Sequence, residues 1–264
     1  MITFGDYVRP KSIEEAYEIF KLKKNATLIG GGCYIRMGNR RIGLAIDLCD
    51  AGLNYINEDE DIIEIGAMTT LRQLETSEIL YENFGPIIAD SVKHIIGVQL
   101  RNIATIGATV FSKYGFSDPI TALLALDADV VFHNSGRISL EEYLKEEGKR
   151  RDILEKIILH KKFDKGAFQS MRNSQVDYAI LNAAVSKKDG KYRIAVGARP
   201  RTATLAYKAM DYINDTEINE ETAMRAGEIA SEELVFGSNT RGSAEYRKEL
   251  CKVLVKRAIM EVEA

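Results

Sequence analysis

Residues 101–130 read RNIATIGATVFSKYGFSDPITALLALDADV, and this stretch is the most informative one for the fold. Its first ten residues carry few reactive side chains but several small residues, among them Thr105, Gly107, Ala108 and Thr109. Residues 118–128 predict a helix, because Pro119 suits the start of a helix and mostly apolar residues follow it. We interpret the small residues as a loop whose backbone can approach another molecule closely.

A second group of small residues ends a predicted strand at residues 26–32, ATLIGGG. Gly30, Gly31 and Gly32 reach positive φ without strain, so their N–H groups can line a concavity that binds pyrophosphate oxygens. The alternative is that the glycines only turn the strand. Neither a Walker A lysine nor the helix of a Rossmann motif follows, so a phosphate site here would use both loops. Valine at Gly31 or Gly107 would then remove the ligand with little loss of folding.

The first part of the chain predicts an α+β unit. An amphipathic helix over residues 10–24 begins with Ser12 and Glu15 at capping-box spacing. Further helices are predicted over residues 69–80, 85–96 and 139–151, the last with a charged surface. Strands are predicted over residues 42–48, 61–68, 129–133 and 155–160.

A second α+β unit follows. Asp189-Gly190 is a specific hairpin signal between predicted strands over residues 177–186 and 191–198. Helices are predicted over residues 202–213, 220–234 and 243–262, and the last carries Leu250, Val253, Leu254 and Ile259 on one apolar face. No linker rich in Pro, Gly or Ser separates the units, so we expect them to pack together.

Composition narrows the class of protein. The 264 residues include 36 basic and 39 acidic side chains without a basic stripe, which argues against nucleic acid as a partner. No apolar run approaches the ~20 residues that span a bilayer, and the N-terminus lacks the regions of a signal peptide, which favours a cytoplasmic location and no membrane contact. The cysteines and histidines lack ligand or disulfide spacing, so no metal site is assigned to this chain. They are Cys33, Cys49, Cys251, His94, His133 and His160.

Five segments, in order, resemble the FAD-binding medium subunits of the molybdenum hydroxylases, the family of xanthine dehydrogenase and carbon monoxide dehydrogenase. They are residues 28–38, 65–75, 101–116, 117–128 and 241–258, and SDPITALLALDA at residues 117–128 is the most specific. The resemblance implies an FAD-binding fold of the vanillyl-alcohol oxidase and p-cresol methylhydroxylase type over residues 1–163, with two α+β subdomains at about 1–55 and 56–163. It also implies a C-terminal α+β domain of the CO dehydrogenase flavoprotein type over residues 164–264.

The resemblance also implies a cofactor site. By position, the two loops would wrap the pyrophosphate and ribityl regions of FAD, Ser117 and Asp118 would bind its hydroxyl or phosphate groups, and Leu154 would lie near the flavin. Asp118 equally suits the N-cap of the following helix, and both roles remain open. The implied cofactor-binding residues are Ile29, Gly30, Gly31, Gly32, Cys33, Tyr34, Thr105, Gly107, Ala108, Thr109, Ser117, Asp118 and Leu154.

The loops depart from the family pattern. Gly32 and Cys33 stand where a hydroxyl and a polar side chain are usual, and Ala108 and Thr109 replace Gly-Asn. Losing two or three hydrogen bonds of ~0.5–1.5 kcal/mol each would weaken FAD binding without abolishing it. We assign Cys33 no catalytic role, because a lone cysteine is more often a small buried side chain than a reactive thiol.

Of three further features, the first two have two interpretations each. Arg101 and Asn102 either contact a phosphate or cap the preceding helix. Tyr34 either covers the flavin or belongs to the core. Arg172 is interpreted as an ion-pair partner of Asp177 at the start of the second unit.

The function that the resemblance implies is an FAD-dependent electron-transfer subunit of an oxidoreductase, without a catalytic residue of its own. A molybdopterin subunit would oxidise the substrate, [2Fe-2S] clusters on an iron-sulfur subunit would pass the electrons, and FAD on this chain would deliver them to an acceptor such as NAD. The alternative is a non-enzymatic interaction subunit of the same fold that has lost its flavin. A flavin reductase acting alone is disfavoured, because no acid-base constellation stands out.

Overall fold

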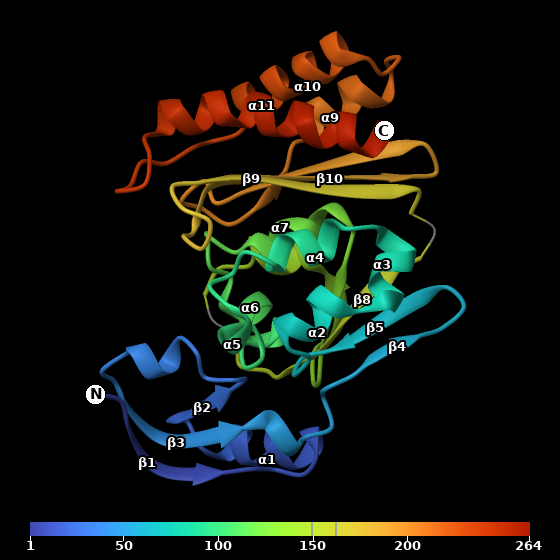
Figure 1. Ribbon diagram of the computed structural model, residues 1–264. Coiled ribbons are helices and arrows are strands. Elements are labelled where there is room, and N and C mark those ends of the chain that lie inside the picture. Colours follow the sequence, from blue (N-terminus) through green and yellow to red (C-terminus); the bar gives the residue numbers. More distant parts are fainter. Residues whose placement is uncertain (149, 162) are drawn as a thin grey trace.

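The computed structural model describes residues 1–148, 150–161 and 163–264. Three β-sheets follow one another along the chain, each with its own helices (Figure 1). The N-terminal sheet lies at one end of the molecule, the middle sheet follows it, and the C-terminal sheet with three covering helices lies at the other end (Figure 1). The mixture of helices and strands is the predicted α+β class.

The N-terminal unit is a three-stranded sheet in the order β1-β3-β2, with β1 and β2 both parallel to β3. Its elements are β1 (Thr3–Val8), α1 (Ile13–Leu22), β2 (Ala26–Ile29), the short 3-10 helix η1 (Ile35–Met37), β3 (Arg41–Asp47) and a second 3-10 helix, η2 (Leu48–Asp50). Half of the capping box predicted for α1 is present, because the Ser12 hydroxyl accepts from the Glu15 N–H at 3.2 Å. The Glu15 carboxylate, however, accepts from the N–H of Lys11 rather than from Ser12.

The middle unit is a five-stranded antiparallel sheet in the order β4-β5-β8-β6-β7. Its strands are β4 (Ile56–Glu58), β5 (Ile62–Gly66), β6 (Asp129–Phe132), β7 (Gly136–Ser139) and β8 (Leu154–His160). Its helices are α2 (Leu71–Thr76), α3 (Glu78–Phe84), α4 (Ile87–Val92), α5 (Val98–Arg101), α6 (Ile106–Ser112), α7 (Asp118–Ala125) and α8 (Leu140–Lys145).

Several boundaries in the middle unit differ from the sequence prediction. The helix predicted over residues 69–80 is two helices, because Ser77 has extended φ and ψ and caps the second one. Helix α8 ends at Lys145, and residue 149 of its predicted range lies outside the described residues. The part of the stretch 101–130 that we expected to be an open loop contains α6, with Thr105 as its N-cap.

Helix α7 occupies the centre of the molecule. All eight of its residues are buried. It packs against α4, α6 and α8 of its own unit and against β10, β11 and β12 of the next one. The helix predicted from SDPITALLALDA is thus confirmed, and its apolar composition reflects burial on every side.

The C-terminal unit is a four-stranded antiparallel sheet in the order β12-β11-β10-β9, covered on its outer face by helices (Figure 1). Its elements are β9 (Lys165–Arg172), β10 (Ala179–Lys188), β11 (Lys191–Gly197), β12 (Thr204–Leu205), α9 (Tyr207–Asn214), α10 (Glu220–Glu233) and α11 (Ala244–Glu263). The predicted hairpin at Asp189-Gly190 is confirmed, with both residues at positive φ. The helix predicted from residue 202 was wrong at its start, because Thr204 and Leu205 pair with β11. Val253, predicted on the apolar face of α11, is 36% exposed.

Candidate functional site

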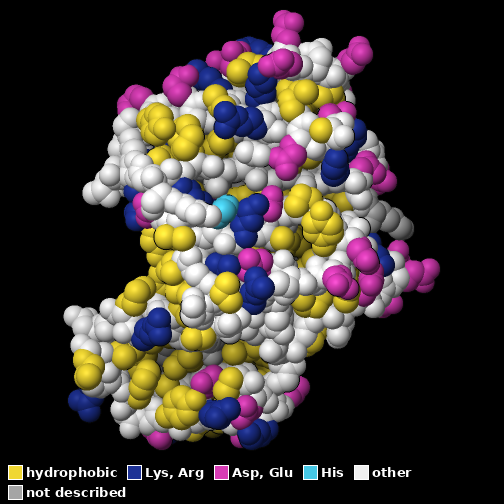
Figure 2. All heavy atoms as spheres, in the orientation of Figure 1, with side chains coloured by type: hydrophobic (Ala, Val, Ile, Leu, Met, Phe, Trp, Pro, Cys, Tyr) yellow, Lys and Arg dark blue, Asp and Glu magenta, His cyan; other side chains and the backbone are white. Residues whose placement is uncertain are grey.

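A cavity of about 350 Å³ lies where the three units meet. Its wall comes from the turn after β2, from α5, α6 and the segment after α6, and from the segment that joins β9 to β10. Figure 2 shows the surface hollowed between the N-terminal unit and the rest of the molecule, with hydrophobic side chains around the hollow. The site is therefore assembled from segments far apart in the sequence.

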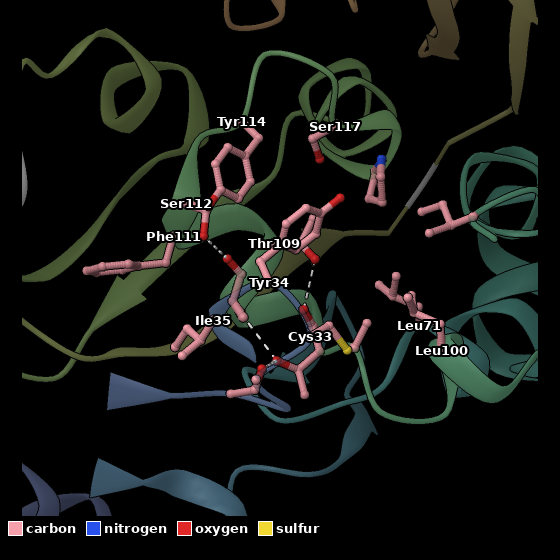
Figure 3. A pocket seen from close by; sticks show the side chains of 18 of the residues that line it. Cys33, Tyr34, Ile35, Leu71, Leu100, Thr109, Phe111, Ser112, Tyr114 and Ser117 are labelled. Atoms are coloured by element: carbon pink, nitrogen blue, oxygen red, sulfur yellow. Dashed lines mark hydrogen bonds between the residues drawn. The ribbon is translucent and has the colours of Figure 1, made fainter. Parts of the chain in front are cut away.

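The structure brings the predicted site residues together. All of them line the cavity except Ile29, which is buried at the end of β2, and Gly31, which packs on the second loop. Figure 3 shows Cys33, Tyr34 and Ile35 around the same space as Thr109, Tyr114 and Ser117. The lining members of the predicted set are Gly30, Gly32, Cys33, Tyr34, Thr105, Gly107, Ala108, Thr109, Ser117, Asp118 and Leu154.

The glycine turn after β2 has the geometry of an anion-binding nest. Gly31 and Gly32 have φ of +73° and +70°. Within the described residues, the backbone N–H groups of Gly31, Gly32 and Tyr34 meet no acceptor. A row of N–H groups in this conformation binds negatively charged oxygens. The turn thus reverses the chain and also offers free donors.

Most N–H groups of the second loop already have acceptors. The N–H of Gly107 donates to the carbonyl of Ala67 at 2.9 Å, and the N–H of Ile106 donates to the carbonyl of Thr69 at 2.9 Å. The N–H of Ala108 meets the Thr105 hydroxyl oxygen at 3.4 Å. The N-terminal N–H groups of α6 therefore already have acceptors in the protein, whereas the N–H of Thr105 meets none within the described residues.

The threonine hydroxyls of this loop are also engaged. The Thr105 hydroxyl donates to the carbonyl of Gly30 at 3.2 Å, which ties α6 to the glycine turn. The Thr109 hydroxyl donates to the carbonyl of Thr105 at 2.9 Å. Each hydroxyl hydrogen is used inside the protein, so each oxygen can only accept a further hydrogen bond from a ligand.

Two of the glycines serve packing. A Cβ on Gly31 would lie 1.9 Å from the carbonyl oxygen of Ile103, and a Cβ on Gly107 would lie 2.5 Å from the carbonyl oxygen of Ala67. The prediction that valine at either position leaves folding intact is therefore wrong. Gly32 differs, because a Cβ there would meet only the Ile29 side chain at 3.5 Å, although its positive φ still disfavours other residues.

A polar region lies at the end of the cavity formed by the start of α7. The Ser117 hydroxyl and the Nε of Arg172 are buried and have no hydrogen-bond partner in the described part of the chain. Both residues line the cavity. Because an unsatisfied buried polar atom costs about 1–3 kcal/mol, these two atoms indicate a polar group that a ligand brings.

Of the two roles predicted for Asp118, the N-cap role is wrong. Ser117 holds the N-cap position of α7, and the carboxylate of Asp118 accepts from Arg172 at 2.6 Å and from Asn182 at 2.5 Å. Burial raises the pKa of Asp118, and Arg172 and then Asn182 oppose that rise. The carboxylate joins α7 to β9 and β10. The predicted pairing of Arg172 with the carboxylate of Asp177 is wrong, because that carboxylate binds Arg241.

Aromatic side chains form one wall. The hydroxyls of Tyr34 and Tyr178 share a hydrogen bond of 2.6 Å. The Phe116 ring lies 4.4 Å from that of Tyr178 and 5.0 Å from that of Tyr114, centroid to centroid. Of the two interpretations of Tyr34, the core position is wrong, because 40% of this residue is exposed and it lines the cavity. Aromatic faces and apolar side chains such as Leu154 suit a planar ring.

Sequence reasoning missed other lining residues. His94 lines the cavity, and burial followed by the charge of Arg172 lowers its pKa. The sequence could have indicated Tyr114 and Phe116 as lining residues, because both lie shortly before Ser117 in the quoted stretch. The sequence could not have indicated Tyr178, because this residue belongs to a different unit.

The other candidates outside this set have structural roles. Arg101 is buried, is not part of the cavity lining, and binds both carboxylate oxygens of Glu75, at 2.8 and 3.1 Å. It also donates to the carbonyl of Ile95 at 3.1 Å, at the end of the helix predicted over residues 85–96. Asn102 occupies the C-cap position of α5. Burial raises the pKa of the Cys33 thiol, which keeps it neutral and poorly reactive.

Across residues 1–148, 150–161 and 163–264, no three His, Cys, Asp or Glu side chains are grouped as metal ligands. Over the same residues, no helix has the length and apolar character needed to cross a membrane.

Comparison with known proteins agrees with this geometry. Residues 2–161 match the family described as FAD binding domain in molybdopterin dehydrogenase, and residues 166–262 match the CO dehydrogenase flavoprotein C-terminal domain. The chain is 28% identical to the nicotine 6-hydroxylase medium subunit of Paenarthrobacter nicotinovorans, over 98% of this chain and 97% of that one. It is 23% identical to the xanthine dehydrogenase FAD-binding subunit of Escherichia coli O157:H7, over 100% and 98%.

A solved structure gives the same fold. The CO dehydrogenase of Oligotropha carboxidovorans matches with a TM-score of 0.88 at 25% identity, over 97% of this chain and 96% of that chain. Free N–H donors, two orphaned polar atoms and apolar walls fit a ligand that combines phosphates with a planar ring. The chain therefore belongs to the family of FAD-binding domains in molybdopterin dehydrogenases and is an FAD-binding subunit of the molybdenum hydroxylase type.

Proposed function

We propose that FAD lies in the cavity between the three units, held by the residues that line it. The observation that carries this proposal is the set of unsatisfied donors on residues that line the cavity: the N–H groups of Gly32 and Tyr34, the Ser117 hydroxyl and the Nε of Arg172. The glycine turn would bind the pyrophosphate, and Ser117 and Arg172 would bind polar atoms elsewhere on the cofactor. Leu154 and the aromatic wall would exclude water from the ring.

In this proposal the chain is the electron-transfer subunit of a larger oxidoreductase. Bound FAD supplies the capacity to collect electrons singly and release them as a pair. The residues of this chain bind the cofactor, orient its ring and leave an edge accessible. The absence of grouped metal ligands among the described residues is consistent with an iron-sulfur subunit and a molybdopterin subunit as separate partners.

The proposal extends to the acceptor and the location. We infer NAD as the acceptor, a cytoplasmic complex, and a substrate that is selected on the molybdopterin subunit. The names of the relatives, which include nicotine and xanthine enzymes, support a common electron-transfer subunit with different substrates. We also infer a division into an FAD-binding domain at 1–163, with subdomains at about 1–55 and 56–163, and a C-terminal domain at 164–264, which the three sheets support.

A visible absorption spectrum tests the cofactor. The purified chain is stripped of ligand, incubated with excess FAD and desalted. We expect flavin bands that are released on denaturation. His94 and Cys33 both line the cavity, so flavin that stays with the denatured chain would instead show a covalent link to one of them. A colourless protein after reconstitution would instead favour the interaction subunit that has lost its flavin.

Co-purification from the native source tests the partners. We expect iron and molybdenum to accompany this chain. The isolated, FAD-loaded chain should be reduced by NADH in a half reaction but not by the substrate of the complex. A fully active preparation of this chain alone, without iron or molybdenum, would contradict the proposal.

A further inference from the structure

A second cavity, of about 380 Å³, lies between helix α8 and the segment that joins β11 to β12. None of the described residues that line it also lines the cavity proposed for FAD. The second cavity is therefore a separate site, to which the proposed function gives no role.

The charged side chains of the second cavity are mostly cations. Lys145, Arg199 and Arg201 line it, and Glu141 carries the only carboxylate among its described lining residues. That carboxylate accepts from Lys145 at 2.7 Å and from the Tyr207 hydroxyl at 2.5 Å. Because Glu141 is already satisfied in this way, the cavity wall supplies no counter-ion for the two arginines.

Arg199 is the half-buried member of this pair. Its Nε donates to the carbonyl of Thr202 at 3.2 Å and its Nη1 to the carbonyl of Val235 at 2.5 Å, while its Nη2 meets no acceptor in the described part of the chain. Every acidic residue is among the described residues, and none forms an ion pair with Arg199. Burial, followed by the charge of Arg201, lowers the pKa of Arg199. A partly buried cation beside a like charge is unfavourable without an anion.

Arg247 shows how the protein satisfies a buried guanidinium that has no ligand. Its Nε donates to the carbonyl of Ile180 at 2.8 Å, its Nη1 to the carbonyl of Gly237 at 2.7 Å, and its Nη2 to the side-chain oxygen of Asn239 at 2.6 Å. All three nitrogens of Arg247 are thus used inside the protein. Arg199 differs, because one nitrogen is left over and the side chain lines a cavity.

Neutral donors lie beside the two arginines. The hydroxyls of Thr202 and Thr204 form no hydrogen bond within the described residues. Over the same residues, the N–H groups of Arg201, Thr202 and Ala203 meet no acceptor. All four residues line the second cavity. Such a group of free donors next to cations suits an oxyanion with several oxygens.

The segment that carries these donors is held in place by the rest of the protein. The N–H of Gly237 donates to the carbonyl of Arg199 at 3.1 Å. A Cβ on Gly115 would lie 3.0 Å from the backbone of Arg201, so the two segments are in close contact. The hydrogen bond from Arg199 to Thr202 closes the segment on itself. The donors are therefore largely ordered before a ligand arrives, which lowers the cost of binding.

We propose that the second cavity binds a phosphate group, either free phosphate or the phosphate of a nucleotide. The two guanidinium groups neutralise its charge, and the threonine hydroxyls and free N–H groups donate to its oxygens. A phosphate monoester carries about -1.5 to -2 charges on three oxygens, which matches two cations and several donors better than a carboxylate does. This inference does not rest on the proposed function, because the two cavities share no described lining residue.

The test removes Arg201, which is exposed and has neither an ion pair nor a hydrogen bond from its side chain in the described structure, so that folding is preserved. Arg199 is left intact, because its hydrogen bonds hold the segment. The matched control is Arg257→Gln on α11, which removes an equally exposed and unpaired arginine of the same unit that lines neither cavity. Each protein, with and without FAD, is titrated with inorganic phosphate, AMP, adenosine and acetate at constant ionic strength.

The unmodified protein and Arg257→Gln should bind phosphate equally well with and without FAD. Arg201→Gln should weaken phosphate and AMP binding about tenfold, and Arg201→Lys should weaken it less, because the charge is kept. Phosphate should raise the unfolding temperature of the unmodified protein more than that of Arg201→Gln. Adenosine and acetate should not bind. AMP that binds more tightly than phosphate identifies a nucleotide as the ligand, and equal affinities identify the phosphate group alone.

Three results would overturn the inference. The first is an equal phosphate affinity in Arg201→Gln and Arg257→Gln, or no phosphate binding at all. The second is phosphate binding that disappears when FAD is bound, because it would then belong to the other cavity. The third is acetate binding as tight as that of phosphate, which would indicate a site for the carboxylates of a partner protein. Phosphate binding in a protein that fails to bind FAD would uphold the inference while the proposed function fails.

Discussion

Tyr34 and Tyr178, which are 144 positions apart in the chain, share a hydrogen bond between their hydroxyls at 2.6 Å. Tyr34 follows the glycine turn of the N-terminal unit, and Tyr178 precedes β10 of the C-terminal unit. The bond therefore joins the two ends of the molecule beside the cavity. Burial, followed by this hydrogen bond, raises the pKa of Tyr34, so its hydroxyl remains protonated at neutral pH.

We expect Tyr178→Phe to lower the free energy of unfolding by about 1 kcal/mol, because one hydrogen bond is lost without a change of shape. FAD should also dissociate faster, because the contact that spans the cavity wall is gone. Urea denaturation and the rate of flavin release measure the two effects. The control is Tyr81→Phe on α3, where the residue is 59% exposed. If the two variants have the same free energy of unfolding and the same rate of flavin release, the hydrogen bond contributes neither to stability nor to FAD retention.

Ser117→Ala should separate binding from folding. The Ser117 hydroxyl is buried without a partner among the described residues, so its removal should leave the unfolding free energy of the apoprotein unchanged or raise it by about 1 kcal/mol. FAD affinity should fall about tenfold, because the ligand loses one buried hydrogen bond. Ser112→Ala is the matched control, since that hydroxyl lines the cavity but donates to the carbonyl of Ala108 at 2.7 Å. A destabilised apoprotein with normal FAD affinity would refute the assignment.

Gly107→Ala should destabilise the fold by about 1–3 kcal/mol or more, because the new methyl group would overlap the backbone of Ala67. Gly97→Ala provides the comparison, since its φ of -147° suits any residue and a Cβ there would meet the flexible end of Gln99 at 3.1 Å. Urea denaturation of the two apoproteins measures their free energies of unfolding. Unchanged stability in Gly107→Ala would show that α6 can move away from β5.

The Glu75–Arg101 pair predicts a pH dependence. Burial acts to raise the pKa of Glu75, but hydrogen bonds from Arg101 and Arg72 outweigh it and hold the pKa below its usual value. The unfolded value is about 4.3, so the stabilisation is complete above that pH and is lost as the pH falls through the lower folded value. Glu75→Gln should cost about 2 kcal/mol of unfolding free energy at pH 7.

The cost of Glu75→Gln should shrink as the pH falls below about 4. Urea denaturation at several pH values measures it. The control is Glu82→Gln, an exposed position on α3. A cost that stays constant down to pH 3 would contradict a stabilising role for the ionised carboxylate.

Local sequence signals identified much of the fold. The glycine turn, the hairpin at Asp189-Gly190 and the apolar helix α7 each have a local cause, namely positive φ or continuous burial. Strand β1 was missed because its residues are mostly exposed, so they show no apolar alternation. Strand β9 was missed because its pairing with β10 is a tertiary contact.

The site was predicted less completely than the fold. Small residues mark both segments, and both line the cavity. The acceptor of the Gly107 N–H was missed, because the carbonyl of Ala67 comes from a distant segment. The partners of Asp118 were hidden for the same reason, since Arg172 and Asn182 lie on strands of the next unit.

The complete burial of α7 has a consequence for how the chain can be divided. Helix α7 packs against elements of both matched families. Helices α4 and α6 belong to the first family's residues, 2–161, and strands β10 and β11 belong to the second family's residues, 166–262. A fragment that begins at Lys165 would leave the α7-facing side of its sheet bare to water, and such an apolar surface promotes aggregation. We therefore expect the separated halves to be poor candidates for autonomous expression, and co-expression of both fragments to restore a soluble, nicked protein.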